Sequence, residues 1–161
     1  MSSNANNPSH RLIRIAEQLC DDTVDGSRLD QTESILKGPL PRCYREFLKA
    51  YNGGKPEPSK FSFALKNGEK TNSTVHYFFA IHNGRVGNLV RQFELSKGRI
   101  PAGSVPIATD PFGNLILIPM LDLPDVPVYF WDHEKELSVE TSFDNVSLIS
   151  ESFEKFIQDL H

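Results

Sequence analysis

Hydrophobic residues in the first part of the chain recur every three or four positions, which is the spacing of an amphipathic helix. This spacing predicts a first helix over Arg11–Leu19, which the polar stretch Asp21–Ser27 ends. The apolar stripe of this helix consists of Leu12, Ile15, Ala16 and Leu19.

Capping residues delimit two further helices. Asp30 is expected to cap the first of them, with Glu33 returning a hydrogen bond and Gly38 at its end. Pro41 suits the first turn of the next helix, because a residue there needs no N–H group. The stripe of this helix is Tyr44, Phe47, Leu48 and Tyr51, and Asn52-Gly53-Gly54 stops it, since glycine tolerates left-handed backbone.

The period then changes to two, which is the period of strands. Phe61, Phe63 and Leu65 alternate with more polar residues up to a turn at Asn67-Gly68, and Val75–Ile81 predicts a second strand. The turn residues Asp110–Asn114 predict a hairpin. Its strands are Val105–Thr109 and Leu115–Met120, and further strands are expected at Val128–Trp131 and within Val139–Ile149.

Two more helices complete the pattern, one over Asn88–Leu95 and one at the C-terminal end that Ser150 caps. Helices first, strands in the middle and a final helix indicate an α+β fold, with helices packed on a largely antiparallel sheet. The length of 161 residues fits a single domain over residues 10–161, behind a polar, disordered tail at Met1–Ser9.

The charge distribution is uneven along the chain. Residues 1–120 carry 15 Lys and Arg against 11 Asp and Glu, whereas residues 121–161 carry 2 against 10, so their balances are +4 and −8. An acidic C-terminal part argues against binding of nucleic acid, which clustered positive charge favours. It favours a basic protein partner. The alternative is a solvated acidic face that only keeps the protein dispersed.

The apolar stretches and the cysteines bear on location. Val75–Ile81 and Leu115–Leu121 are much shorter than the roughly 20 residues that span a bilayer, and the N-terminus lacks an apolar signal region. We therefore expect a cytoplasmic protein. In that reducing compartment Cys20 and Cys43 are expected to be small buried thiols, with a disulfide between them as the alternative.

Motifs that carry chemistry are scarce. The sequence has no GxSxG elbow, no GxxxxGK[ST] phosphate loop, no HExxH helix and no CxxC pair. Asp132 beside His133 is the arrangement closest to an acid–base pair, but neighbours on a strand point to opposite faces. We therefore interpret Trp131 as a core anchor and Asp132-His133-Glu134 as a polar turn. Asp110 and Asn114 are interpreted as turn residues rather than metal ligands. We expect no metal and no cofactor.

Four segments in order resemble the SUKH superfamily over about residues 30–161. The first is Leu40-Pro41 with Tyr44, Phe47-Leu48 and Asn52-Gly53-Gly54, and the second is Val105–Ala108 with Asp110, Gly113 and Asn114. The third is Val128–Glu134, and the fourth is Ser152–Phe156. The proline-rich stretch Leu123–Pro127 departs from the common pattern, and the predicted helix at Arg11–Leu19 is an addition.

The resemblance implies helices packed against a curved, mixed sheet and no catalytic residues. It also implies one of two binding functions: most bacterial members serve as immunity proteins that block toxins, often nucleases, and fungal relatives regulate cell-wall glucan synthesis through protein contacts. A hydrolase using Asp132 and His133 is the enzymatic alternative. The candidate contacts with a basic toxin domain are Asp122, Asp125, Asp132, Glu134 and Glu136, together with an exposed Phe112.

Overall fold

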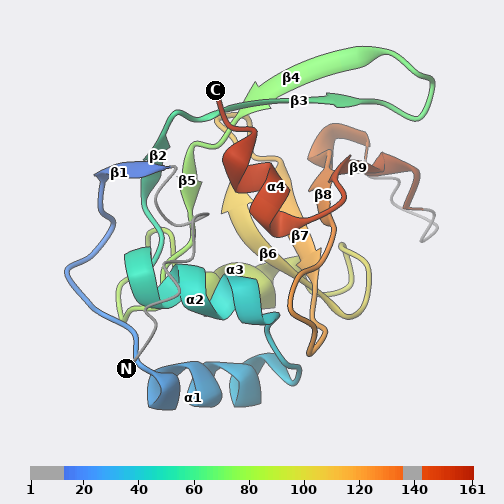
Figure 1. Ribbon diagram of the computed structural model, residues 1–161. Coiled ribbons are helices and arrows are strands. Elements are labelled where there is room, and N and C mark those ends of the chain that lie inside the picture. The colour runs from blue at the N-terminus through green and yellow to red at the C-terminus, as the bar shows by residue number, and fades with distance from the viewer. Residues whose placement is uncertain (1–12, 136–142) are drawn as a thin grey trace.

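The computed structural model describes residues 13–135 and 143–161 and confirms an α+β fold (Figure 1). The predicted tail at Met1–Ser9 lies outside the described residues. The helices are α1 (Gly26–Leu36), α2 (Arg42–Tyr51), α3 (Leu89–Ser96) and α4 (Phe153–Gln158). The strands are β1 (Arg14–Glu17), β2 (Lys55–Glu57), β3 (Lys60–Ala64), β4 (Lys70–Thr74), β5 (Tyr77–Phe78), β6 (Ser104–Thr109), β7 (Leu115–Pro119), β8 (Val128–Trp131) and β9 (Val146–Ser150).

A five-stranded sheet in the order β5-β6-β7-β8-β9 forms the centre of the fold. Its neighbouring strands pair antiparallel, for example through Val105 opposite Ile118 and Leu117 opposite Tyr129. The predicted hairpin around Asp110–Asn114 and the predicted strand Val128–Trp131 are confirmed. Two shorter antiparallel pairs, β1-β2 and β3-β4, accompany this sheet.

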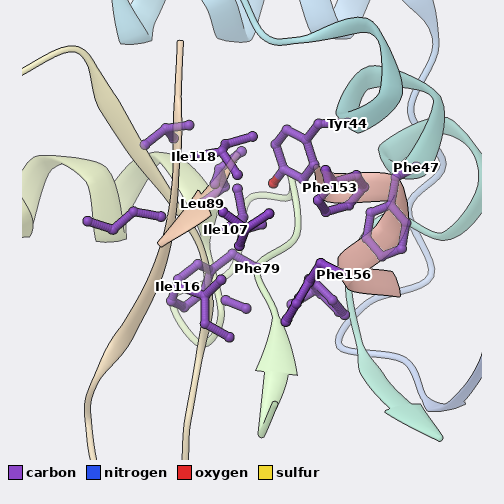
Figure 2. Close-up of a cluster of buried hydrophobic side chains, with 14 of the residues drawn as sticks. Tyr44, Phe47, Phe79, Leu89, Ile107, Ile116, Ile118, Phe153 and Phe156 are labelled. Carbon is purple, nitrogen blue, oxygen red and sulfur yellow. The ribbon is translucent and has the colours of Figure 1, made fainter. Parts of the chain in front are cut away.

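Helices α2 and α4 bury aromatic side chains against the sheet (Figure 2). The ring of Phe153 on α4 lies 5.7 Å from that of Tyr44 and 5.4 Å from that of Phe47, both edge-on. These rings face aliphatic side chains of the sheet such as Ile107 and Ile116. Aromatic groups of this size supply much of the free energy of a core, so α2, α4 and the sheet form one packed unit.

The stop after α2 also joins this helix to the sheet. Asn52 adopts left-handed backbone, and its buried side-chain amide donates to the carbonyl oxygens of Asp22 and Ile81 and accepts from the N–H of Ile81. A Cβ on Gly53 would lie 2.7 Å from the carbonyl oxygen of Phe78, so the backbones approach too closely for a side chain. The predicted helix stop is confirmed.

The predicted helix at Arg11–Leu19 is wrong. Its described part contains β1, a strand that pairs antiparallel with β2. Backbone pairing with β2 satisfies the N–H and C=O groups that a helix would have satisfied internally, and Ile13 is buried in the core. The alternation of Ile13 and Ile15 with Arg14 and Ala16 is the signal for this strand.

Three predicted helix ends are displaced. Asp25 rather than Asp30 caps α1, since its carboxylate accepts from the N–H of Arg28 at 2.8 Å, and Lys37 rather than Gly38 is the left-handed C-cap. Ser150 lies at the end of β9, and Ser152 caps α4 instead. The two N-capping residues, Asp25 and Ser152, lie where the chain turns out of extended backbone into the helix.

Other strand predictions are confirmed in part. Only Tyr77–Phe78 of the expected strand Val75–Ile81 pairs as a strand, although the N–H of Phe79 still donates to Ile107. The strand expected within Val139–Ile149 begins at Val146, and residues 139–142 lie outside the described residues. No helix in the described ranges is long and apolar enough to cross a membrane.

Candidate protein-binding surface

The residues predicted to contact a partner divide between the two ends of the sheet. Phe112 lies in the turn before β7, whereas Asp122 and Asp125 follow β7, a strand of five residues that spans about 15 Å. Since β8 is antiparallel to β7, Asp132 and Glu134 lie at the Phe112 end. The candidate contacts therefore form two separate surfaces rather than one acidic face.

The turn between β6 and β7 is built on a buried carboxylate. Asp110 is 2% exposed. Its Oδ1 atom accepts from the N–H groups of Phe112 and Asn114, and its Oδ2 atom accepts from Asn114 Nδ2 and Ser73 Oγ, all at 2.9–3.0 Å. The interpretation of Asp110 and Asn114 as turn residues is confirmed. The hydroxyl of Ser73, from β4, is a member of this network that sequence reasoning missed.

The side chains of Asp132 and His133 both form hydrogen bonds in the neighbouring turn. Asn114 Oδ1 lies 2.8 Å from Nδ1 of His133 and also accepts the N–H of His133, so the imidazole is bonded to Asn114. Asp132 Oδ1 accepts from the N–H of Glu134, and its Oδ2 lies 3.6 Å from Lys135 Nζ. A short 3-10 helix, His133–Lys135, forms this turn, and Trp131 before it is buried. The interpretation of a core anchor followed by a polar turn is confirmed.

Phe112 is the most exposed large hydrophobic residue among those described, with 73% of its surface accessible. The hydrogen bonds to Asp110 fix the backbone of its turn, so the ring is presented from a preorganised position. A rigid aromatic side chain loses little conformational entropy on binding, which suits it to anchor a protein interface. The exposed Glu134 places negative charge at the same end of the sheet, whereas the charge of Asp132 is offset by Lys135.

At the other end, Asp122 and Asp125 differ in what their carboxylates contact. The side chain of Asp122 is 79% exposed and lies 3.9 Å from Nε of Arg42. Asp125 accepts from the N–H of Phe153 at 2.8 Å and from that of Val126 at 2.7 Å, and so holds the start of α4. Asp122 is therefore presented to solvent, whereas Asp125 is committed within the fold.

Cys43 also contacts Asp125, with its Sγ atom 3.4 Å from a carboxylate oxygen. Burial raises the pKa of the Cys43 thiol to about 12, and the negative charge of Asp125 adds to this shift. Cys20 and Cys43 are both free thiols, as expected, but they are partly rather than fully buried. A thiol with so high a pKa is a poor nucleophile at neutral pH.

Two further observations concern the predicted site. Glu136 lies outside the described residues. Within residues 13–135 and 143–161, no group of three or more His, Cys, Asp or Glu side chains is placed to hold a metal ion.

Comparison with known proteins identifies the family. Residues 23–159 match the SMI1 / KNR4 family (SUKH-1). The chain is also 26% identical over 173 residues to the SPbeta prophage-derived uncharacterized protein YokK of Bacillus subtilis (strain 168), an alignment that covers 92% of this chain and 85% of the relative. The family match includes every helix of the described structure and the whole five-stranded sheet. The chain therefore belongs to the SMI1 / KNR4 family (SUKH-1).

Proposed function

We propose that this chain is a non-catalytic, cytoplasmic protein-binding domain that neutralises a toxin by forming a complex with it. The observation that carries the proposal is the turn network around Asp110. In this network Asn114 and His133 are hydrogen-bonded within the fold, and Phe112 is exposed to solvent. Membership of a family in which most bacterial members serve as immunity proteins supports the same function.

The Phe112 end of the sheet is the surface proposed to contact the toxin. Phe112 supplies an apolar anchor, and the exposed Glu134 supplies negative charge that suits a basic toxin domain such as a nuclease, whereas Lys135 offsets the charge of Asp132. Encounter led by charge is screened beyond about 10 Å at 0.1 M salt. We expect binding that is micromolar or tighter. Because salt screens these charges, binding should weaken as salt is added.

Co-expression with the product of the adjacent gene tests this proposal. We expect cells to survive and the two proteins to purify together in equal amounts. The variant His133→Ala should still protect the cells, because the proposed function requires no general base. Loss of protection by a folded variant that still purifies together with the toxin would support the hydrolase alternative. If no adjacent product is toxic or binds, a regulatory or scaffolding domain of the glucan-synthesis-regulator type replaces the immunity function.

A further inference from the structure

A cleft of about 490 Å³ lies between α1 and the start of α3. Its volume falls within the roughly 300–1,000 Å³ range of ligand sites in proteins. The face of α1 that lines it carries residues at positions i, i+3, i+4 and i+7, which lie on one side of a helix. These residues are Arg28, Gln31, Thr32 and Ile35, and the opposite wall is formed by Asn88, Val90 and Arg91.

The cleft lies at the end of the sheet opposite Phe112. β5 is antiparallel to β6, so Ile81, which lines the cleft, lies beyond β5 towards the start of β6, whereas Phe112 follows the end of β6. The cleft is therefore separate from the surface proposed above.

The walls of the cleft are cationic. Within the described part of the chain, neither Arg28 nor Arg91 forms an ion pair with a carboxylate, and Arg28 Nη2 donates to Asn83 Oδ1 at 3.3 Å. By contrast, Arg45 lies within salt-bridge distance of both Asp30 and Glu33. The N-terminal end of α3, which carries partial positive charge, borders the same space.

The lining of the cleft also includes three aliphatic residues, Ile35, Ile81 and Val90, and part of this apolar surface is uncovered. Ile81 is buried there, whereas Ile35 is 52% exposed although it belongs to a helix that packs on the core. Both ring nitrogens of His82 are within 3.1 Å of backbone groups of their own loop, at Val86 and Gly84. The groups left to bind a ligand therefore include the two guanidinium groups, the exposed amide of Gln31 and the aliphatic side chains.

We infer that this cleft binds an acidic segment of a protein partner, with aliphatic side chains between its carboxylates. Guanidinium groups bind carboxylates through paired, charge-assisted hydrogen bonds, and Ile35, Ile81 and Val90 accept an aliphatic side chain. Nucleic acid is a poorer match, because the chain carries a net charge of −4 and the lining of the cleft contains no Phe, Tyr or Trp on which bases could stack. The inference rests on the proposed protein-binding function and adds a second contact surface to it.

The test is a titration of the full-length chain, labelled with ¹⁵N, with a capped eight-residue peptide of alternating glutamate and leucine. We expect chemical-shift changes at Thr32, Ile35 and Val90. The double variant Arg28→Glu/Arg91→Glu should bind the peptide at least about tenfold more weakly, since two charge-assisted contacts are lost.

The matched control is Lys60→Glu/Lys70→Glu, which changes the net charge equally at exposed positions of the β3-β4 hairpin. It should keep the wild-type affinity within about twofold, because salt screens charges that are remote from the cleft. Equal weakening by both double variants, absence of shifts in the cleft, or tighter binding there of a single-stranded RNA oligonucleotide would overturn the inference.

The peptide titration requires no toxin, so it separates the two proposals. Peptide binding in the cleft without toxin neutralisation removes the immunity function and leaves the cleft as a site for an acidic segment. Toxin neutralisation without peptide binding, and with unchanged affinity of Arg28→Glu/Arg91→Glu for the toxin, removes the cleft inference alone.

Discussion

The two ends of the sheet differ in shape, charge and construction. At one end, hydrogen bonds to the buried Asp110 fix a turn that projects Phe112 beside acidic residues. At the other, α1 and α3 enclose a cleft with Arg28 and Arg91 on its walls. The residues that resemble the family pattern build the first turn, whereas the arginines of the cleft lie outside the quoted motifs. The two ends of one sheet thus present surfaces of opposite charge, an acidic one at the turn and a basic one at the cleft.

Truncating Phe47 should destabilise the core on which both ends of the sheet rest. Phe47→Ala deletes a buried ring that contacts Phe153 and Phe78, so the free energy of unfolding should fall by about 3–5 kcal/mol. Tyr44→Phe is the matched control. It removes a buried hydroxyl that has no partner among the described residues and should change stability by less than about 1 kcal/mol. Chemical denaturation measures both, and a mild effect of Phe47→Ala would contradict this packing.

Substituting Asp110 should weaken toxin binding at the Phe112 end and leave peptide binding in the cleft unchanged. Asp110→Ala leaves the N–H groups of Phe112 and Asn114 without their acceptor, and we expect a loss of about 3 kcal/mol of stability. Affinity for the toxin should fall, because the turn is no longer fixed. The glutamate–leucine peptide should still bind in the cleft of the folded fraction. Loss of peptide binding in a folded variant would contradict the separation of the two ends.

The reactivity of Cys43 tests whether the carboxylate of Asp125 is held next to the Cys43 thiol. Because the folded-state pKa is about 12 and the ordinary value is 9.0, thiolate at pH 9 should be scarce in the folded protein. Alkylation of Cys43 should be slower than in the unfolded chain by on the order of a hundredfold. Asp125→Asn should speed alkylation, whereas Asp122→Asn should not.

The same shift predicts a loss of stability at high pH. Between about 9 and about 12 the folded state keeps the thiol proton that the unfolded state has released, so the free energy of unfolding falls as pH rises. Cys43→Ala should remove this part of the decline. A decline of equal size in Cys43→Ala would mean that other groups cause it.

Phe112→Ala tests whether toxin affinity depends on the exposed ring at one end of the sheet. We expect its affinity for the toxin to fall about tenfold while stability changes by less than about 0.5 kcal/mol, because the ring is 73% exposed. Val86→Ala is the control, since Val86 is 71% exposed but lies in the loop before α3, at the opposite end. Calorimetric titration measures both, and equal effects would argue against a localised anchor at Phe112.

The sequence predicted the elements whose local signals agree with their tertiary contacts. β8 has the predicted bounds, Val128–Trp131, and α2 follows Pro41 and stops at Asn52. The first helix failed because four apolar residues at helical spacing cannot outweigh pairing with β2, a strand about 40 residues further along the chain. The local signal for this strand, the alternation over residues 13–16, is shorter than the helical spacing that competes with it.

The candidate site was predictable in its residue types but not in its arrangement. The positions of acids along residues 121–161 do not reveal that Asp125 is bonded to the start of α4 while Asp122 faces solvent. The cleft had a signal, since Arg28, Gln31, Thr32 and Ile35 share one helix face. Its opposite wall, however, comes from α3, and only the packed structure brings the two helices together.

The most direct test of a binding rather than catalytic function is a titration of toxin activity with the purified chain. Our account predicts that toxin activity falls linearly and reaches its minimum at one molar equivalent, for the wild-type chain and for His133→Ala alike. Complete inactivation by a small fraction of an equivalent, lost in His133→Ala, would mean that the chain turns over its target and would contradict the account.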